Sequence, residues 1–323
     1  MDIPDASFRG APAAGFFSCP GKDIDATGGW LFWKRKPGDS LRRSLIRRGQ
    51  LFPVLVDSGG SRPVLVAGAA RLACLAEEGR SVLCRDVGPL DAWERGLVYL
   101  ESNAAFDIDD WRVVRALRYF RGLDPARLEE VWTVLGFEPR ARRARQAVAW
   151  LKLPEEWDGL LAAGNIPLAC VDALEKMDAA EIGALFPLFA AFSWSRGNAV
   201  NLLAWLRETG LRENRDIGGM LAAARERRLA SDLSPKDAMA RITAEIRALR
   251  YPELTALERN FAAAARRISA GTGWRLTQPD QFETEAVDMS VRLTCAADVE
   301  RAARQLADMA LADWSGIFME ADS

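Results

Sequence analysis

The segment from Arg140 to Leu151 carries the side chains best suited to chemistry on a polyanion. Guanidinium groups neutralise phosphates and release their counterions, and a glutamine amide can contact a base edge. Between Arg112 and Lys152 there are ten basic and four acidic residues, a local charge of +6 in a chain of net charge −2. We therefore predict contact with double-stranded DNA, against the alternative of an ordinary solvated helix face. The candidate DNA-binding residues are Arg140, Arg142, Arg143, Arg145 and Gln146.

A second candidate anion site lies at Gly68, which precedes an alanine-rich helix predicted from Ala69 to Glu78. The first N–H groups of a helix are free and lie at the positive end of its dipole, which suits a phosphate. Arg71, one turn into this helix, is placed to pair with a phosphate oxygen. Gly68 and Arg71 are therefore candidate nucleotide-binding residues.

The residue inventory excludes several catalytic and metal-binding chemistries. The chain has no histidine, which removes imidazole acid–base catalysis, histidine-containing triads and histidine metal ligands. Its five cysteines are scattered without a CxxC pair, so neither a disulfide framework nor a zinc site is expected. Cys74 lies among Leu72, Ala73 and Leu75, which predicts a small buried residue rather than a nucleophile. We expect no catalytic residues and no metal ligands.

The basic segment follows a helix and a turn, which is the order of a helix-turn-helix motif. Asp124 and Pro125 begin the first helix, and Gly136 ends it. The basic segment is then the helix that enters the groove of the DNA. Helices predicted from Trp111 to Phe120 and from Leu160 to Leu211 are expected to support it as a bundle.

The chain before residue 110 alternates between helix and strand patterns. Residues 1–39 are rich in glycine and proline with interspersed aromatic residues, and we expect one or two short strands from them in the first sheet. A helix is predicted from Leu90 to Ser102. The pattern between them predicts a helix behind Ser40, strands from Leu51 to Val56 and from Pro63 to Val66, the helix from Ala69 to Glu78 and a strand from Ser81 to Val87.

Several of these segments resemble the ParB family, the DNA-partitioning proteins of bacterial chromosomes and plasmids. The residues that carry the resemblance to its N-terminal domain are Ser44-Leu45-Ile46, Gly49-Gln50-Leu51-x-Pro53-x-x-Val56 and Gly68-Ala69-Ala70-Arg71-Leu72. After the basic segment, Leu151-Lys152-Leu153-Pro154-Glu155-Glu156 and Gly164-Asn165-Ile166-Pro167 resemble the part of the family that follows the DNA-reading helix. The resemblance covers residues 40–175, and within it Cys170 and Asp172 replace the histidine and arginine of the family.

The resemblance implies a nucleotide site, and the chain departs from it. A ParB protein that binds CTP with Mg²⁺ uses the Gly68 segment, and Asn103 matches a second segment that helps to hold the nucleotide. Ala69 and Ala70 replace an acid and an arginine, and Phe106 replaces another arginine. Loss of charged contacts at about 1.5–3 kcal/mol each would remove micromolar affinity. We therefore expect no cofactor and a lost nucleotide switch, with CTP and Mg²⁺ at Gly68, Arg71 and Asn103 as the alternative.

The last part of the chain predicts a small αβ domain. A helix is expected from Leu254 to Ser269, a half-buried strand from Val287 to Leu293, and an amphipathic helix from Ala297 to Trp314. Elements this short need a partner surface, so a homodimer through this domain is predicted, with packing inside one chain as the alternative. The apolar stripe of the last helix is predicted to comprise Val299, Ala303, Leu306, Met309 and Ala310.

The predicted fold class is therefore α+β and mostly helical, with several domains. The predicted order is an N-terminal arm (1–39), a small mixed ParB-like αβ domain (40–110), a helix-turn-helix and helical support domain (111–211), a linker (212–237) and a C-terminal αβ domain (238–323).

The predicted function is that of a ParB-like DNA-binding protein in DNA partition or in transcriptional or plasmid regulation. The alternatives are a protein-interaction module on the same scaffold and, third, a CTP-dependent DNA clamp with CTPase activity. The family resemblance implies a bacterial, nucleoid-associated protein in the cytoplasm and a ParA-type ATPase as partner. The longest apolar run, from Ile182 to Phe192, is too short for a membrane span, and Met1 to Ala14 lack the pattern of a signal peptide.

Overall fold

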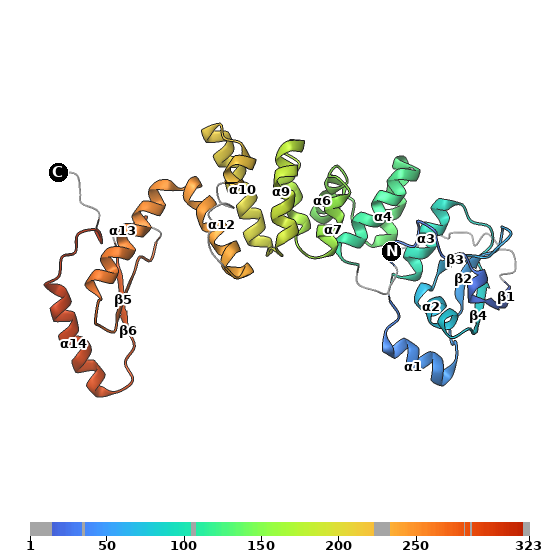
Figure 1. Ribbon diagram of the computed structural model, residues 1–323, viewed down its shortest axis with the longest axis horizontal. Coiled ribbons are helices and arrows are strands. Elements are labelled where there is room, and N and C mark those ends of the chain that lie inside the picture. The colour runs from blue at the N-terminus through green and yellow to red at the C-terminus, as the bar shows by residue number, and fades with distance from the viewer. Residues whose placement is uncertain are drawn as a thin grey trace, which may run out of the picture. The chain divides into compact units, whose positions relative to one another are not determined.

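The computed structural model describes residues 15–33, 36–104, 108–222, 233–280, 282–284 and 286–318. The chain divides into two compact units, Met1–Leu203 and Ala204–Ser323 (Figure 1). The fold is α+β and mostly helical, as predicted. The finer domain boundaries at residues 40, 111 and 238 stay predictions, and most of the second half of the predicted linker lies outside the described residues.

A four-stranded mixed sheet opens the first unit, in the order β1-β4-β2-β3 (Figure 1). β1 pairs antiparallel with β4, β4 runs parallel to β2, and β2 pairs antiparallel with β3. The predicted alternation of helices and strands is confirmed, and β1 is a strand contributed by the N-terminal arm. The elements are β1 (Phe16–Pro20), α1 (Asp39–Arg48), β2 (Val54–Asp57), β3 (Val64–Ala67), α2 (Ala69–Glu77), β4 (Ser81–Asp86) and α3 (Ala92–Ser102).

The start of β2 differs from the prediction of a strand from Leu51. Leu51 and Phe52 form an exposed bend, with 60% and 70% of their surface accessible, and the strand begins at Val54. The amide of Gln50 takes the place of backbone pairing here. It accepts a hydrogen bond from the N–H of Leu83 at 2.7 Å and donates one to the carbonyl of Leu83 at 2.8 Å. An amide side chain thus replaces a strand residue, which an apolar run does not reveal.

A buried carboxylate connects the sheet to α3. Asp57 is 1% exposed and accepts hydrogen bonds from the N–H groups of Gly59 and Leu90. Arg95 of α3 donates two further hydrogen bonds to it, at 2.9 and 2.7 Å. Burial alone would raise the pKa of Asp57, but the two backbone donors and Arg95 hold that pKa below its usual value. The carboxylate therefore stays ionised and paired at neutral pH.

The rest of the first unit is helical. Trp150, Trp157 and Phe120 are among its fully buried side chains, so large rings fill the spaces between the helices. α5, the turn at Gly136 and α6 confirm the predicted order of helix, turn and basic helix. The helices are α4 (Asp110–Leu123), α5 (Leu128–Leu135), α6 (Arg142–Trp150), α7 (Glu156–Ala162), α8 (Val171–Leu174) and α9 (Ala179–Ala191), and α10 (Arg196–Glu213) continues into the second unit.

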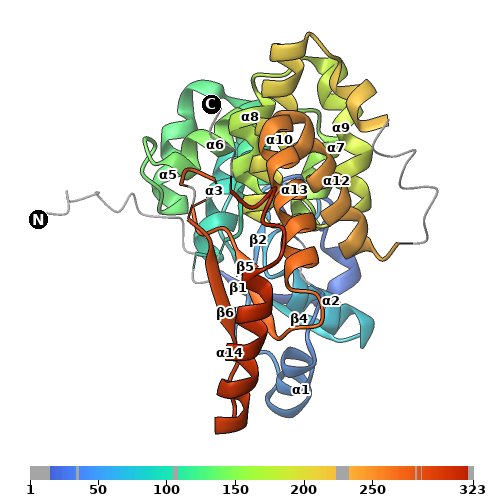
Figure 2. The ribbon, with the colours of Figure 1, turned by 90° about the vertical axis from the view of Figure 1, so that its left-hand side faces the viewer.

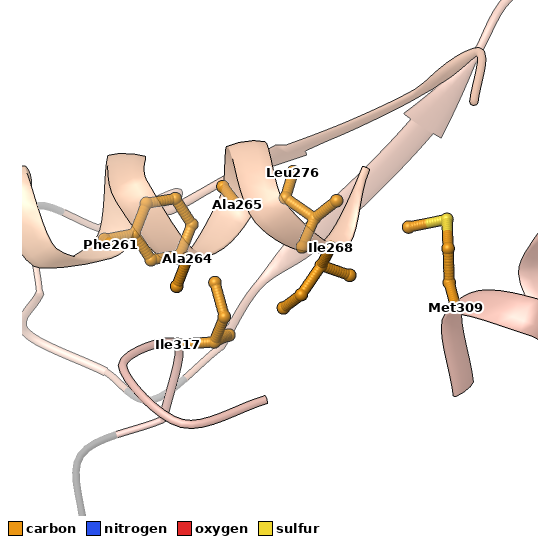
Figure 3. Close-up of a cluster of buried hydrophobic side chains, with 7 residues drawn as sticks. All are labelled: Phe261, Ala264, Ala265, Ile268, Leu276, Met309 and Ile317. Carbon is orange, nitrogen blue, oxygen red and sulfur yellow. The ribbon is translucent and has the colours of Figure 1, made fainter. Parts of the chain in front are cut away.

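The second unit contains α12 (Pro235–Arg250), α13 (Pro252–Ile268), the hairpin of β5 (Trp274–Thr277) and β6 (Asp288–Val291), and α14 (Ala296–Ala310). Two views show β6 and α14 side by side (Figures 1 and 2). The close-up in Figure 3 shows the core of this part, to which α13 contributes four side chains and β5, α14 and the C-terminal segment one each. None of the described helices, in either unit, has the length and apolar character to span a membrane.

The face of α14 that is buried differs from the predicted apolar stripe. The buried residues are Asp298, Ala302 and Met309, because the hairpin packs on that side and the indole N–H of Trp274 donates to the carbonyl of Ala302 at 3.1 Å. Of the predicted stripe, only Met309 lies in this core. The remaining residues, Val299, Ala303, Leu306 and Ala310, are exposed in the described part of the unit.

Candidate nucleic-acid interface

The predicted DNA-reading helix is α6, and one of its faces is anchored in the core. Ala144, Ala147 and Trp150 are essentially inaccessible to solvent. Arg142, Arg145 and Val148 lie on the exposed side, and Arg140 is in the turn that precedes the helix. The helical period therefore separates an apolar face from a basic face, as expected for a helix that packs on one side only.

The carboxylate of Asp158 fixes the C-terminal end of α6. It accepts hydrogen bonds from Nε and Nη2 of Arg118 at 2.5 and 2.9 Å, and from the indole N–H of Trp150 at 2.9 Å. Arg118 also donates to the carbonyls of Leu151 and Leu153, which are free at the end of the helix. We call this arrangement of Arg118, Trp150 and Asp158 the Asp158 junction. It joins α4, α6 and α7.

Arg143, a predicted DNA-binding residue, is used inside the protein. Its Nε donates to Asp110 at 2.6 Å, and its Nη2 donates to the carbonyl of Ile108 at 2.8 Å. Its guanidinium also lies 4.7 Å from the centre of the Phe137 ring, within the range of a cation–π interaction. Arg143 thus connects the first turn of α6 to the start of α4 and to the turn before α6.

Arg142 and Gln146 both contact the same acid. Nη2 of Arg142 and Nε2 of Gln146 each donate to Oδ2 of Asp172 at 2.8 Å, and Gln146 is only 6% exposed. Burial would raise the pKa of Asp172, but the hydrogen bonds from Arg142 and Gln146 lower it below its usual value. We call these two hydrogen bonds the Asp172 bridge. The sequence shows an acid in place of the arginine of the ParB pattern, but it does not show what this acid contacts.

Arg140 and Arg145 remain as exposed cations. Neither side chain makes a hydrogen bond or an ion pair within the described ranges of the chain. Lys152, at the end of α6, is also exposed and lies 3.8 Å from a carboxylate oxygen of Glu175. Arg142, Arg145, Gln146 and Lys152 line a shallow hollow of about 480 Å³ on this surface. The structure thus brings three of the five predicted DNA-binding residues, Arg142, Arg145 and Gln146, to this hollow. Arg140 is exposed in the turn before α6, and Arg143 makes its contacts inside the protein.

The three predicted nucleotide-binding residues line one pocket of about 610 Å³. Gly68 has a φ of 101°, and a β-carbon there would lie 3.0 Å from Cγ1 of Val54, so only glycine fits without strain. Ala69 and Ala70 border the same pocket and bring no charge to it. Phe106 lies outside the described residues.

Two of these predicted ligands make hydrogen bonds within the protein. Nη1 of Arg71 donates to the carbonyls of Phe52 and Pro53 at 3.0 and 2.7 Å, and burial lowers the pKa of Arg71. Nδ2 of Asn103 donates to the carbonyl of Tyr99 at 2.8 Å, at the end of α3. Arg71 therefore holds the exposed bend before β2, and Asn103 caps a helix.

The cysteine that borders this region is buried. Cys74 is inaccessible to solvent and its burial raises the pKa of its thiol, so the prediction of a small buried residue is confirmed.

Comparison with known proteins gives structural likenesses only. No protein-family model matches the chain, and no curated protein is significantly similar to it. The chain is similar to the C-terminally truncated chromosome-partitioning protein ParB of Caulobacter crescentus complexed to the centromeric parS site (16% identity, 58% of this chain and 98% of that chain, TM-score 0.37). It is also similar to the C-terminally truncated ParB of Caulobacter crescentus complexed with CTP-γ-S (19% identity, 55% of this chain and 99% of that chain, TM-score 0.25). A third similar structure is a Pnob8-like ParB-N domain (12% identity, 76% of this chain and 96% of that chain, TM-score 0.34). These three TM-scores are all below 0.5.

The Asp158 junction predicts a specific loss of stability. Asp158→Ala leaves the guanidinium of Arg118 and the indole N–H of Trp150 without their acceptor, so the free energy of unfolding should fall by about 2–4 kcal/mol. Asp158→Asn keeps a neutral acceptor and should lose less. Chemical denaturation followed by tryptophan fluorescence measures both.

A matched control is Glu77→Gln, which removes an exposed ion pair with Arg42 and should change stability little. An Asp158→Ala variant as stable as this control would contradict the structural role of the junction.

Proposed function

We propose that this protein is a ParB-like DNA-binding protein that places α6 in the major groove of duplex DNA. The observation that carries the proposal is the set of exposed cations, Arg140, Arg142, Arg145 and Lys152, on and beside α6, the helix that follows α5 and the turn at Gly136. Helices of this kind enter the groove while the preceding helix crosses the phosphate backbone. The cellular role is DNA partition or regulation of transcription or plasmid maintenance, and association with the nucleoid follows from it.

Within this surface, the cations have different roles. Arg140 and Arg145 are exposed and have no described ion-pair partner, so they are suited to neutralise phosphates. Arg143 is half-buried and makes three contacts inside the protein, so it positions α6 rather than binding DNA. Arg142 combines both roles, because its guanidinium is exposed to solvent but is also bonded to Asp172.

The nucleotide switch of the ParB pattern is lost in this proposal. Arg71 and Asn103 are bonded to backbone carbonyls, and the positions next to Gly68 carry alanine. A triphosphate would meet an Arg71 whose Nη1 already donates to two carbonyls, so only the other N–H groups of this arginine would be available to it. The pocket retains Lys36 and Arg85, whose charges alone give a smaller attraction for CTP and Mg²⁺.

A homodimer through α14 is part of the same proposal. Val299, Ala303, Leu306 and Ala310 follow the spacing of four, three and four residues that forms a coiled-coil seam, and all are exposed. Val299 and Leu306 are 53% and 39% accessible. A second copy of the same helix, related by a two-fold axis, would cover the same stripe on both chains. Such a dimer would present two copies of α6 to DNA, whereas a ParA-type ATPase would be a separate partner.

DNA binding is tested with the full chain and fluorescein-labelled duplexes, random and genomic, by anisotropy over a range of salt concentrations. Arg140→Ala/Arg145→Ala removes two proposed phosphate contacts, so the magnitude of the slope of log K against log salt should fall by about 2. The control Arg47→Ala/Arg48→Ala removes the same charge from α1 and should change the slope less. A wild-type protein that binds no duplex at low salt would leave the protein-interaction module as the better function.

Loss of the nucleotide switch is tested by calorimetric titration with CTP and Mg²⁺. We expect no dissociation constant below about 1 mM, because the charged contacts are absent or used internally. Arg71→Ala should then lower stability, because it frees the bend at Phe52 and Pro53, while nucleotide affinity stays undetectable. Micromolar binding of CTP, or its turnover to CDP and phosphate, would instead favour the CTP-dependent clamp.

The α14 dimer is tested by light scattering coupled to size-exclusion chromatography. Leu306→Glu places a charge in the centre of the stripe and should convert a dimeric wild-type protein into a monomer. Arg304→Glu changes an exposed residue on another side of α14 and should leave the dimer intact. A monomeric wild-type protein at micromolar concentration, or equal effects of both substitutions, would argue against this interface.

A further inference from the structure

Asp172 lies on α8 and contacts α6 from there. α8 packs against α6, and Cys170 and Val171 beside Asp172 are inaccessible to solvent. Burial raises the pKa of the Cys170 thiol to about 12, so this cysteine is a packing residue. The Asp172 side chain lies at the edge of this contact and is 45% exposed. Its position is therefore fixed by the two buried residues that precede it, while its carboxylate lies at the proposed DNA surface.

The Asp172 bridge removes two of the predicted DNA contacts from use. An ionised carboxylate only accepts hydrogen bonds, so Arg142 and Gln146 both donate to it. Gln146 is almost fully buried in this arrangement. A phosphate that binds Arg142 must either replace Asp172 at Nη2 or use the other N–H groups of the guanidinium, and in both cases it must approach the negative charge of Asp172. This repulsion acts on every duplex, whatever its sequence.

We propose that Asp172 withholds Arg142 from DNA phosphates and thereby weakens the sequence-independent, phosphate-driven part of DNA binding. This inference rests on the proposed function of α6. Under it, random duplex is bound by Arg140, Arg145 and Lys152, and Arg142 contributes little while the bridge is intact.

The test is a double-mutant cycle of Asp172 and Arg142 on a random duplex, measured by anisotropy over a range of salt concentrations with the full chain. Asp172→Asn keeps the size of the side chain and removes its charge. It should tighten binding by about fivefold, the upper value for an exposed ion pair, and steepen the salt slope by about 0.9. Arg142→Ala should change binding little in the wild-type protein but should reverse this gain in the Asp172→Asn background. A merely structural role of Asp172 would not produce this coupling.

Glu138→Gln is the matched control, because it removes one negative charge from the exposed turn before α6 without breaking the bridge. Glu138→Gln should increase the affinity for random duplex less than Asp172→Asn does, and this increase should be the same with and without the Arg142→Ala substitution. Three results would overturn the inference. If the wild-type protein binds duplex and Asp172→Asn binds it with the same affinity, the role of the Asp172 bridge is contradicted but the proposed function is not. The same holds if Arg142→Ala changes the affinity equally in the wild-type and Asp172→Asn proteins. Absence of duplex binding in the wild-type protein and in Asp172→Asn contradicts the proposed function as well.

Discussion

The position of α6 depends on the Asp158 junction more than on any preference of the helix itself. A helix of this length is marginal in water, so tertiary contacts must hold it. Trp150 does so in two ways, because its ring is fully buried and its N–H donates to Asp158. Arg118 completes the arrangement by binding the same carboxylate and the carbonyls that end α6. The Asp158 junction therefore fixes the C-terminal end of α6 and, with it, the position of the basic face.

The charge count of the sequence overstates the positive surface of this region, for a physical reason. The window from Arg112 to Lys152 omits acids that lie outside it in sequence but beside it in space. Asp110 neutralises Arg143, Asp158 binds Arg118, and Asp172 binds Arg142. Arginine serves both to hold helices together and to meet solvent, and composition does not separate these uses. The face was therefore predictable from helical spacing, but the cations available on it were not.

Elements with local signals were predictable, and those set by distant contacts were not. Gly136 ends α5 with a φ of 71°, a conformation that glycine adopts without strain, and Asp91 caps α3 through its own side chain. In contrast, β2 starts late because Gln50 binds Leu83 on another strand. The buried face of α14 is likewise set by the hairpin that packs on it, and most of the predicted apolar stripe is exposed.

The shape of the pocket at Gly68 is held by contacts within the protein. The backbone that opens α2 still requires glycine, since Val54 packs where a β-carbon would lie. Arg71 lines the same pocket, and Nη1 of its guanidinium satisfies two carbonyls of the bend before β2. A partly desolvated guanidinium that is bonded to the backbone contributes to stability. Gly68 and Arg71 therefore each have a role in folding, whatever the pocket binds.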